Sequence, residues 1–229
     1  MNKVCIFDLD GTLIDSLEDL ATAGNYLMEQ LDYPTHPVEA YKLFVGSGIK
    51  NLILRAVPER SLDEAQLNKA TELYMTYYSQ HCSVFTTIYP HITEVLDELK
   101  IMGYQLAVVT NKPDVIAQKI VEDLFGDRFA YVYGQVEHIP VKPDPTLVER
   151  VLKKTKVLKE NAYYIGDSDV DIFTAKNAGI VSVGCLWGNR TEEELQQAGA
   201  KFLAKDAKDI IDIIRGEEND RSESMFVRG

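Results

Sequence analysis

Two aspartates follow the first apolar segment of the chain and are spaced to act together. Residues 4–7 are apolar and lead directly into Asp8-Leu9-Asp10-Gly11-Thr12-Leu13. Side chains two apart on an extended backbone point to the same side, so Asp8 and Asp10 should leave one buried strand together. Two carboxylates held side by side are costly unless a cation or a substrate occupies the space between them. The pair therefore predicts a reaction or metal site.

Three further polar clusters follow later apolar segments. In a doubly wound sheet the strand ends near the helix N-termini form one crevice, so clusters far apart in sequence should converge there. Acidic oxygens for a metal, together with donors for phosphate oxygens, are what a magnesium-assisted phosphoryl-transfer site needs. The residues of these clusters are Thr110, Asn111, Lys142, Asp167, Asp169 and Asp171.

The Asp-x-Asp spacing also occurs in calcium-binding loops and in ordinary turns. Neither Asp8 nor Asp167 begins a calcium loop, because the positions for the invariant glycine and the bidentate glutamate hold other residues. A simple turn after a strand explains the first pair alone, but it does not explain four clusters at four predicted strand ends.

Four motifs of the chain resemble, in order and spacing, those of the haloacid-dehalogenase-like hydrolase superfamily. The resemblance covers residues 3–215. Within the superfamily, Thr110-Asn111-Lys112-Pro113 and the segment 44–48 are most similar to the phosphoglycolate-phosphatase-like branch, which has a helical cap domain. The four motifs are Asp8-Leu9-Asp10-Gly11-Thr12-Leu13, Thr110-Asn111, Lys142 within Val-Lys-Pro-Asp-Pro, and Gly166-Asp167-Ser168-x-x-Asp171.

The resemblance implies catalytic roles for five of these residues. Asp8 would attack phosphorus and form an aspartyl-phosphate. Asp10 would protonate the leaving alkoxide and then take a proton from the attacking water. Thr110 and the backbone around Asn111 would bind the phosphoryl oxygens, and Lys142 would offset the negative charge around the nucleophile.

The resemblance also implies Mg²⁺ as the cofactor. The ion would be bound by Asp8, the backbone carbonyl of Asp10 and Asp167, with Asp171 bound directly or through water. Asp169 stays open: it is either a metal ligand or a solvated residue in the first turn of the following helix.

Short apolar segments alternate with amphipathic helices through most of the chain. The strand segments are apolar on both faces, which is typical of strands covered by helices on both sides. Proline near the start and glycine after the end mark several of the helices. We therefore predict an α/β fold with a doubly wound parallel sheet, a Rossmann-like core. The strands are expected at residues 4–7, 105–109, 130–133, 162–165 and 180–186, and the helices at 90–102, 113–125, 145–156 and 169–178.

One connection is much longer than the others. Residues 8–104 separate the first two predicted strands, where one crossover helix would need a few dozen residues at most. This insert is predicted to be helical, with one helix beginning at Ser16 and another beginning with a capping box formed by Ser61 and Glu64. The expected units are a catalytic core, residues 1–15 and 87–215, an inserted all-helical cap domain, residues 16–86, and a disordered tail, residues 216–229.

The cap is expected to supply contacts to the substrate. Gly46 and Gly48 lack the third glycine of a dinucleotide loop, so we predict a cap loop whose backbone approaches the substrate closely. Lys50 and Arg55 in the cap, and Lys112 in the core, are candidate contacts for a second anionic group of the substrate.

The composition limits the partners and the location. The net charge of the 229 residues is −12, which disfavours nucleic acid and anionic membranes as partners. No apolar run approaches the roughly 20 residues of a membrane helix, and the first residues lack the core of a signal peptide. We expect a cytoplasmic monomer or homodimer that acts on a small phosphorylated molecule.

The predicted function is a magnesium-dependent phosphatase of small phosphate monoesters, phosphoglycolate-like or sugar phosphates. Asp10 argues for phosphate esters, because the similar enzymes that cleave carbon–halogen bonds or phosphonates lack this second carboxylate. One alternative is a phosphomutase resembling β-phosphoglucomutase, although that branch usually carries a serine-rich motif in place of Thr110-Asn111. A non-catalytic binding module is the other alternative, and the intact acidic and lysine motifs argue against it.

Overall fold

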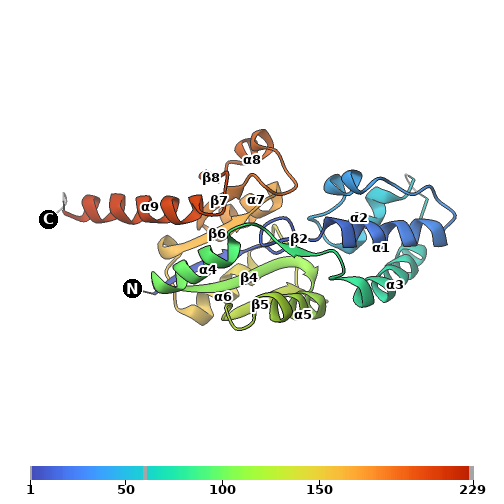
Figure 1. Cartoon of the computed structure of the whole chain (residues 1–229), viewed down its shortest axis with the longest axis horizontal. Helices are drawn as coiled ribbons and strands as arrows, with labels where there is room; N and C mark the ends of the chain where they lie inside the picture. Colours follow the sequence, from blue (N-terminus) through green and yellow to red (C-terminus); the bar gives the residue numbers. More distant parts are fainter. Residues whose placement is uncertain (1, 59–60, 227–229) are drawn as a thin grey trace.

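A six-stranded parallel sheet lies at the centre of the computed structural model, which describes residues 2–58 and 61–226 (Figure 1). The order of the strands is β5-β4-β1-β6-β7-β8, and every neighbouring pair is parallel. The chain builds outward from β1 to β5 and then returns to build β6, β7 and β8 on the other side. The order therefore reverses beside β1, where doubly wound folds bind their ligands. The strands are β1 (Lys3–Phe7), β4 (Tyr104–Pro113), β5 (Tyr131–Gln135), β6 (Ala162–Gly166), β7 (Val181–Cys185) and β8 (Phe202–Ala204).

Helices cover both faces of the sheet. Alternate residues of β1 show this, because Cys5 and Phe7 pack in one apolar cluster while Val4 and Ile6 pack in another. The first cluster includes α4 (Ile92–Ile101), α5 (Asp114–Phe125) and α9 (Asp209–Phe226), and the second includes α6 (Thr146–Thr155) and α7 (Asp169–Ala178). A short helix η2 (Lys159–Asn161) leads into β6, and α8 (Glu192–Ala198) packs beside α7. The predicted doubly wound parallel sheet is confirmed.

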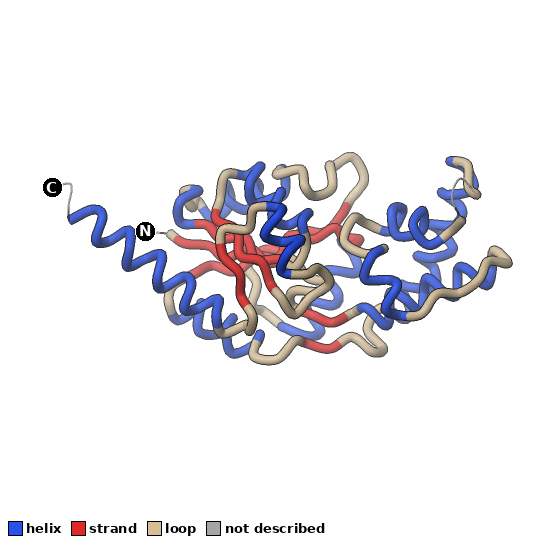
Figure 2. The backbone as a smooth tube through the Cα atoms, turned by 90° about the horizontal axis from the view of Figure 1, so that it is seen from above, coloured by secondary structure: helices blue, strands red, loops and turns tan. Residues whose placement is uncertain are grey.

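The helical insert forms a separate lobe beside the sheet (Figures 1 and 2). It contains α1 (Leu17–Gln30), η1 (Val38–Leu43), α2 (Ile49–Ala56) and α3 (Glu64–His81). The predicted capping box of Ser61 and Glu64 is wrong. Instead, Asp63 accepts a hydrogen bond from the backbone of Gln66 and the Gln66 side chain accepts one from the backbone of Asp63, each at 2.8 Å. The backbone of Ser61 donates to Pro58, in a turn that precedes the helix.

A two-stranded antiparallel ribbon marks the place where the chain leaves the core and returns to it. The ribbon pairs β2 (Ile14–Asp15) with β3 (Thr87–Ile88). Next to it, the buried carboxylate of Asp19 accepts hydrogen bonds from the backbone of Phe85 and from the backbone and hydroxyl of Thr86, at 2.6 to 3.1 Å. We propose that this ribbon is the boundary between core and cap, as the sequence predicts.

The C-terminal segment differs from the prediction. We expected a disordered tail over residues 216–229, but α9 continues to Phe226, and residues 227–229 lie outside the described part. Polar contacts with the core hold the start of this extension. Glu218 accepts a 2.6 Å hydrogen bond from the Tyr104 hydroxyl and forms an ion pair with Lys3, while Glu217 lies 2.9 Å from Lys201.

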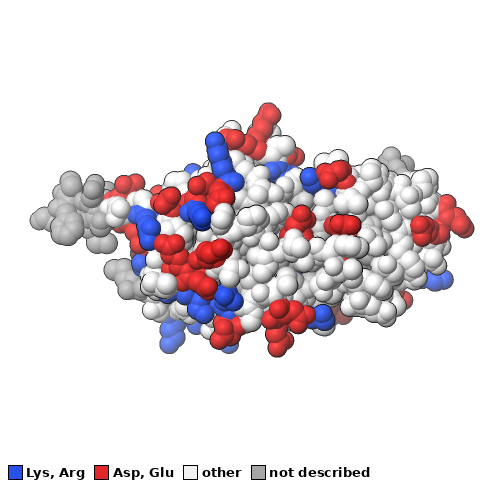
Figure 3. Space-filling model, viewed as in Figure 1, with Lys and Arg blue, Asp and Glu red and all other residues white. Residues whose placement is uncertain are grey.

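Acidic and basic side chains are interspersed over the sheet lobe on the face shown in Figure 3. This mixture, with the net charge of −12, gives that face no continuous basic surface of the kind that binds nucleic acid. Among the helices of residues 2–58 and 61–226, none has the length and apolar character needed to span a membrane.

Candidate active site

Three carboxylates from separate parts of the chain converge at the carboxyl edge of the sheet. Asp8 follows β1, Asp167 follows β6, and Asp171 lies in the first turn of α7. Because β1 and β6 pair in parallel up to Phe7 and Ile165, the residues that follow them leave the sheet side by side. One oxygen from each carboxylate lies within 4.8 Å of the others, and all three side chains are buried. The predicted convergence of the first and fourth motifs is present in the structure.

Glycines make room for these carboxylates. A Cβ atom at Gly166 would lie 2.3 Å from the Cβ of Asp171, and one at Gly188 would lie 2.3 Å from the Cβ of Asp167. Gly11 also has a φ of +84°, and a Cβ there would lie 2.3 Å from a carboxylate oxygen of Asp167. Any larger residue at these positions would displace the acidic cluster.

Lys142 supplies a buried positive charge next to the acidic cluster. Its ammonium donates hydrogen bonds to Asp171 Oδ1 at 2.7 Å and to the Tyr164 hydroxyl at 3.0 Å, and it lies 2.9 Å from Asp8 Oδ1. Burial lowers the pKa of Lys142, but the carboxylates of Asp171 and Asp8 outweigh burial and raise this pKa well above the ordinary value. The lysine therefore stays protonated and balances part of the acidic charge.

The negative charge of the cluster is only partly compensated. Asp8 Oδ1 is buried and has no hydrogen bond of good geometry among the described residues, although the Lys142 ammonium is close to it. Burial, followed by repulsion from Asp171, raises the pKa of Asp8 to about 7, and burial is also the main cause that raises the pKa of Asp167 to about 6. A cation bound between the carboxylates would restore their charged forms. The donor set consists of oxygen atoms, which Mg²⁺ prefers in proteins.

Asp167 is held by a loop that the sequence analysis did not single out. Its Oδ2 accepts hydrogen bonds from the backbone and the side chain of Asn189, at 2.8 and 2.9 Å, and its Oδ1 accepts one from the Thr12 hydroxyl at 3.0 Å. Trp187, in the same loop, donates to the carbonyl of Thr12 at 3.0 Å. The signal in the sequence was the polar Gly188-Asn189-Arg190, which follows the fifth predicted strand at the same edge of the sheet.

Asp10 is not part of the acidic cluster and has its own partners. Its Oδ1 accepts hydrogen bonds from the Ser16 hydroxyl at 2.5 Å and from the Lys112 ammonium at 2.7 Å. Lys112 also donates to the hydroxyl of Tyr78 on α3, in the helical lobe. Lys112 is therefore a buried residue of the site, where an ion pair links it to the second aspartate of the first motif.

Thr110 and Asn111 lie inside β4, because this strand continues through the second motif to Pro113. The Thr110 hydroxyl accepts a 3.2 Å hydrogen bond from the backbone of Lys112. The Asn111 side chain accepts a hydrogen bond from the backbone N–H of Lys142 at 2.8 Å and donates to the carbonyls of Lys142 and Gly46, at 3.2 and 3.1 Å. The Asn111 amide thus ties two segments to β4: the loop that carries Lys142, and the cap loop of residues 44–48.

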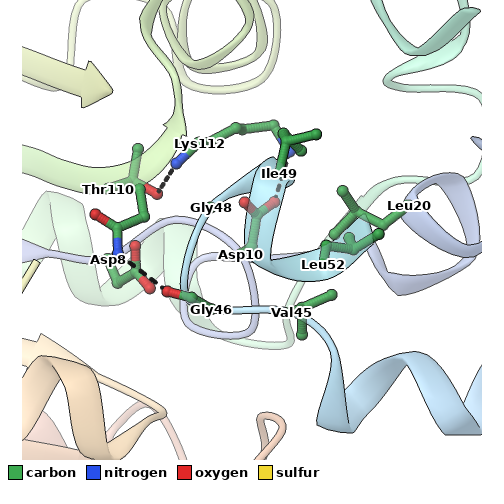
Figure 4. Close-up of a pocket in the computed structure, with 11 residues that line it drawn as sticks. Asp8, Asp10, Leu20, Val45, Gly46, Gly48, Ile49, Leu52, Thr110 and Lys112 are labelled. Carbon is green, nitrogen blue, oxygen red and sulfur yellow. Dashed lines mark hydrogen bonds and ion pairs between the residues drawn. The ribbon is translucent and has the colours of Figure 1, made fainter. Parts of the chain in front are cut away.

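A small cavity joins these groups between the two lobes (Figure 4). Its volume is about 40 Å³, room for roughly three water molecules at about 10–15 Å³ each. Figure 4 shows Asp8 and Thr110 on the core side and Leu20, Val45 and Leu52 on the cap side. The lining residues are Asp8, Asp10, Leu20, Val45, Gly46, Gly48, Ile49, Leu52, Thr110, Asn111 and Lys112.

The predicted cap residues fall into two groups. Gly46 and Gly48 line the cavity with φ angles of +101° and +85°, a conformation that glycine adopts readily. Lys50 is a correction: it is exposed, it does not line the cavity, and its ammonium donates to Asn68 at 2.9 Å. On α2, Ile49 and Leu52 lie three apart and face the cavity, so Lys50 points elsewhere. Arg55 donates instead to carbonyls of the cap loop, including that of Phe44 at 3.0 Å.

Asp169 is not part of the acidic cluster. It lies 3.7 Å from Arg190, and its side chain is 44% exposed. Arg190 also donates to the carbonyls of Lys42 in η1 and of Val45 in the cap loop, the latter at 3.4 Å. Of the two readings left open by the sequence, the geometry fits a solvated first-turn residue of α7.

Comparison with known proteins agrees with this geometry. Residues 5–185 match the family model described as haloacid dehalogenase-like hydrolase. The chain belongs to this family. The resemblance expected from the four motifs is thereby confirmed, and the matched region contains all of them.

Several relatives of the chain carry the name phosphoglycolate phosphatase. The protein of that name from Vibrio parahaemolyticus is 32% identical over 218 residues, which are 93% of this chain and 96% of the relative. The one from Neisseria meningitidis is 37% identical over 186 residues, which are 80% of this chain and 79% of the relative. The structure of a predicted phosphoglycolate phosphatase from Haemophilus somnus has a TM-score of 0.84 and 31% identity, and the match covers 93% of this chain and 97% of that one.

Proposed function

We propose that the protein is a magnesium-dependent phosphatase that hydrolyses small phosphate monoesters, such as phosphoglycolate, through an aspartyl-phosphate on Asp8. The observation that carries the proposal is the buried Asp8 carboxylate, which faces the cavity, lies 2.9 Å from Lys142 and has an oxygen without a directed hydrogen bond. Family membership and the names of the relatives support hydrolysis of phosphate esters.

The acidic cluster fits a magnesium ion. We propose that the carboxylates of Asp8 and Asp167 and the backbone carbonyl of Asp10 hold it, with Asp171 bound directly or through water. When bound, the ion would neutralise charge on the phosphate and on the nucleophile. Asp171 already accepts hydrogen bonds from Lys142 and Ser168, at 2.6 to 3.0 Å, so in our proposal its first task is to hold Lys142.

Two aspartates would share the chemical steps. The Asp8 carboxylate attacks phosphorus, a new O–P bond forms, and the bond from phosphorus to the leaving alkoxide breaks. Asp10 gives its proton to that alkoxide and later takes one from the water that attacks the aspartyl-phosphate, which regenerates Asp8 and releases inorganic phosphate. Asp10 lies just beyond the carboxyl end of β1, and its contacts with Ser16 and Lys112 would hold it there for both proton transfers.

The remaining site residues would bind the phosphoryl group. In our proposal the Thr110 hydroxyl and the backbone N–H groups near Asn111 donate to its oxygens. The Asn111 side chain contributes indirectly, since it fixes the backbone of Lys142. Lys142 then keeps its positive charge close to the nucleophile and the transferred group.

The cap would control entry and the choice of leaving group. A cavity of about 40 Å³ is too small for a phosphate ester, so the two lobes must separate for substrate to bind. Lys112 is the one basic residue among the described residues that line the cavity, and we propose that it binds the second anionic group of the substrate. The backbones of Gly46 and Gly48 would approach the same part of the substrate. A cytoplasmic location and a monomeric or homodimeric state remain predictions.

The test is an assay of the purified protein with Mg²⁺ and, separately, phosphoglycolate, an aryl phosphate, and hexose 1-phosphate with its bisphosphate activator. The proposal predicts phosphate release from phosphoglycolate that chelation with EDTA stops and added Mg²⁺ restores. Isomerisation of the hexose phosphate without phosphate release would instead support the phosphomutase alternative. No turnover of any substrate would refute both enzymatic functions.

A further inference from the structure

The ammonium group of Lys112 lies at the contact between the two lobes. Its side chain is only 1% exposed, and its carrier strand β4 belongs to the core. The ammonium donates to Asp10 of the core at 2.7 Å and to the hydroxyl of Tyr78 on the cap helix α3, and it lies 5.0 Å from the centre of the Tyr78 ring. One cation thus has a partner in each lobe.

Tyr78 is the partner that distinguishes this contact from the others between the lobes. The backbone of the cap accepts hydrogen bonds from Asn111 and Arg190, so those contacts do not depend on cap side chains. Apart from Ser16 at the domain boundary, Tyr78 is the one cap residue whose side chain hydrogen-bonds to a core side chain within the described residues. Tyr78 is itself fully buried and does not line the cavity, so it can reach a substrate only through Lys112.

We propose that Tyr78 is a positioning residue, which holds the Lys112 ammonium in the orientation that binds the second anionic group of the substrate. Because Tyr78 belongs to the cap, Lys112 has this orientation only while the cap is closed against the core. The inference rests on the proposed phosphatase function. A lysine ammonium has three N–H donors. Two of them have partners here, in Asp10 and Tyr78, which leaves one for an anion in the cavity that Lys112 lines.

The surroundings explain why the position of this single cation matters. The cap side of the cavity is formed by the side chains of Leu20, Val45, Ile49 and Leu52, which offer no charge. An anionic leaving group against this wall would be costly to bury unless a cation met it. The two other basic candidates from the sequence are engaged elsewhere, Lys50 with Asn68 and Arg55 with carbonyls of the cap loop.

Without the Tyr78 hydroxyl, the flexible lysine would be held by Asp10 alone. The lysine side chain has four carbons between backbone and charge, so one partner leaves much of its rotational freedom. When the cap lifts away, the Tyr78 contact is lost, and Lys112 loses its cap partner. In our proposal the anion site therefore has both partners of Lys112 in place only while the cap is closed against the core.

Tyr78→Phe tests the inference, because it removes the hydroxyl and keeps the ring. The readout is the ratio of kcat/KM for phosphoglycolate to kcat/KM for p-nitrophenyl phosphate, which lacks a second anionic group. We expect this ratio to fall about tenfold in Tyr78→Phe, mainly through a higher KM for phosphoglycolate, as for the loss of one hydrogen bond to a charged group. Tyr78→Gln, which keeps an acceptor for Lys112, should restore part of the ratio.

Tyr74→Phe is the matched control. Tyr74 is also fully buried on α3, but its hydroxyl donates at 3.3 Å to the carbonyl of Leu20, inside the cap. Its loss should leave the substrate ratio within about twofold of the wild-type value. Thermal unfolding of each variant would confirm that it is folded.

A double-mutant cycle with Lys112→Met separates an action through Lys112 from an independent one. Once Lys112 is absent, adding Tyr78→Phe should change the ratio by less than about twofold. An unchanged ratio in folded Tyr78→Phe, or a full further loss in the Lys112→Met background, would overturn the inference. If the proposed phosphatase function is itself wrong, the result is distinguishable from failure of the Tyr78 inference, because the wild-type protein would then hydrolyse neither substrate.

Discussion

The two walls of the cavity are built in different ways. The core wall consists of charged and polar side chains, and neighbours hold most of them: Asp10 accepts from Ser16 and Lys112, and Asn111 accepts from the backbone of Lys142. The cap wall consists of apolar side chains and glycine backbone. From this difference we propose that the core performs the same chemistry on every substrate, while the cap side determines which leaving group fits.

The largest effect should come from the core wall, with Asp8→Asn. Loss of the nucleophile is expected to reduce kcat by roughly 10⁴-fold or more for every substrate, as is typical of a missing nucleophile. The measurement is phosphate release under saturating substrate and Mg²⁺. Retained turnover would remove the covalent mechanism.

The same substitution should stabilise the metal-free protein. The pKa of Asp8 is raised from 3.8 to about 7 in the folded chain, so its protonated form favours folding at low pH, and that contribution is lost as the pH rises through 7. In EDTA at pH 8, Asp8→Asn should therefore have a Tm higher by about 2 °C or more, and the gain should shrink toward pH 4. A lower Tm at pH 8 would show that the Asp8–Lys142 attraction outweighs burial.

Asp10→Asn should have the next largest effect, and it should depend on the leaving group. A missing general acid and base typically costs about 10²- to 10⁴-fold in rate, and alkyl phosphates need protonation more than aryl phosphates do. Rapid-quench kinetics should show formation of the aspartyl-phosphate from an aryl phosphate, followed by slow hydrolysis. Equal losses for both kinds of ester would argue against the acid-base role.

Asn189→Ala should weaken the metal site without touching the reacting groups. The Asn189 backbone and side chain both donate to Asp167, and loss of such a supporting contact typically reduces metal affinity by about 10- to 100-fold. The affinity can be measured as the Mg²⁺ concentration that gives half of the maximal rate. A lower kcat at saturating Mg²⁺ with unchanged Mg²⁺ affinity would contradict this role.

The smallest effect should come from Lys50→Ala on the cap. Lys50 is exposed and contacts Asn68, so kcat/KM for phosphoglycolate should change by less than about twofold. A tenfold loss would mean that Lys50 swings into the site when substrate binds. The cap would then supply a second cation, and the contrast between the two walls would weaken.

The acidic cluster and the lysine beside it were the easier part to predict from the sequence. The four polar clusters each follow an apolar segment, and parallel strands bring such ends to one edge, so the meeting of Asp8, Asp167 and Lys142 follows from local patterns and topology. The fold class follows from the same alternation of strands and helices.

What sequence patterns did not predict depends on packing between distant segments. The pairing of Lys112 with Asp10 and Tyr78 joins residues from three elements, and no spacing in the chain indicates it. Lys50 and Ile49 are neighbours on a short helix, but only Ile49 faces the cavity, because packing buries the apolar side of that helix. The α9 helix continues beyond residue 215 and contacts the core there, as Glu218 does with Tyr104, and a segment without periodicity does not reveal such contacts.

The covalent role of Asp8 is tested most directly by trapping the phosphorylated protein. Asp10→Asn would be mixed with an aryl phosphate and Mg²⁺, quenched in acid within the first turnover, digested and analysed by mass spectrometry. We expect one added phosphoryl group on the peptide that contains Asp8, and none in the variant that also carries Asp8→Asn. A phosphoryl group on another residue, or phosphate release without any labelled peptide, would contradict it.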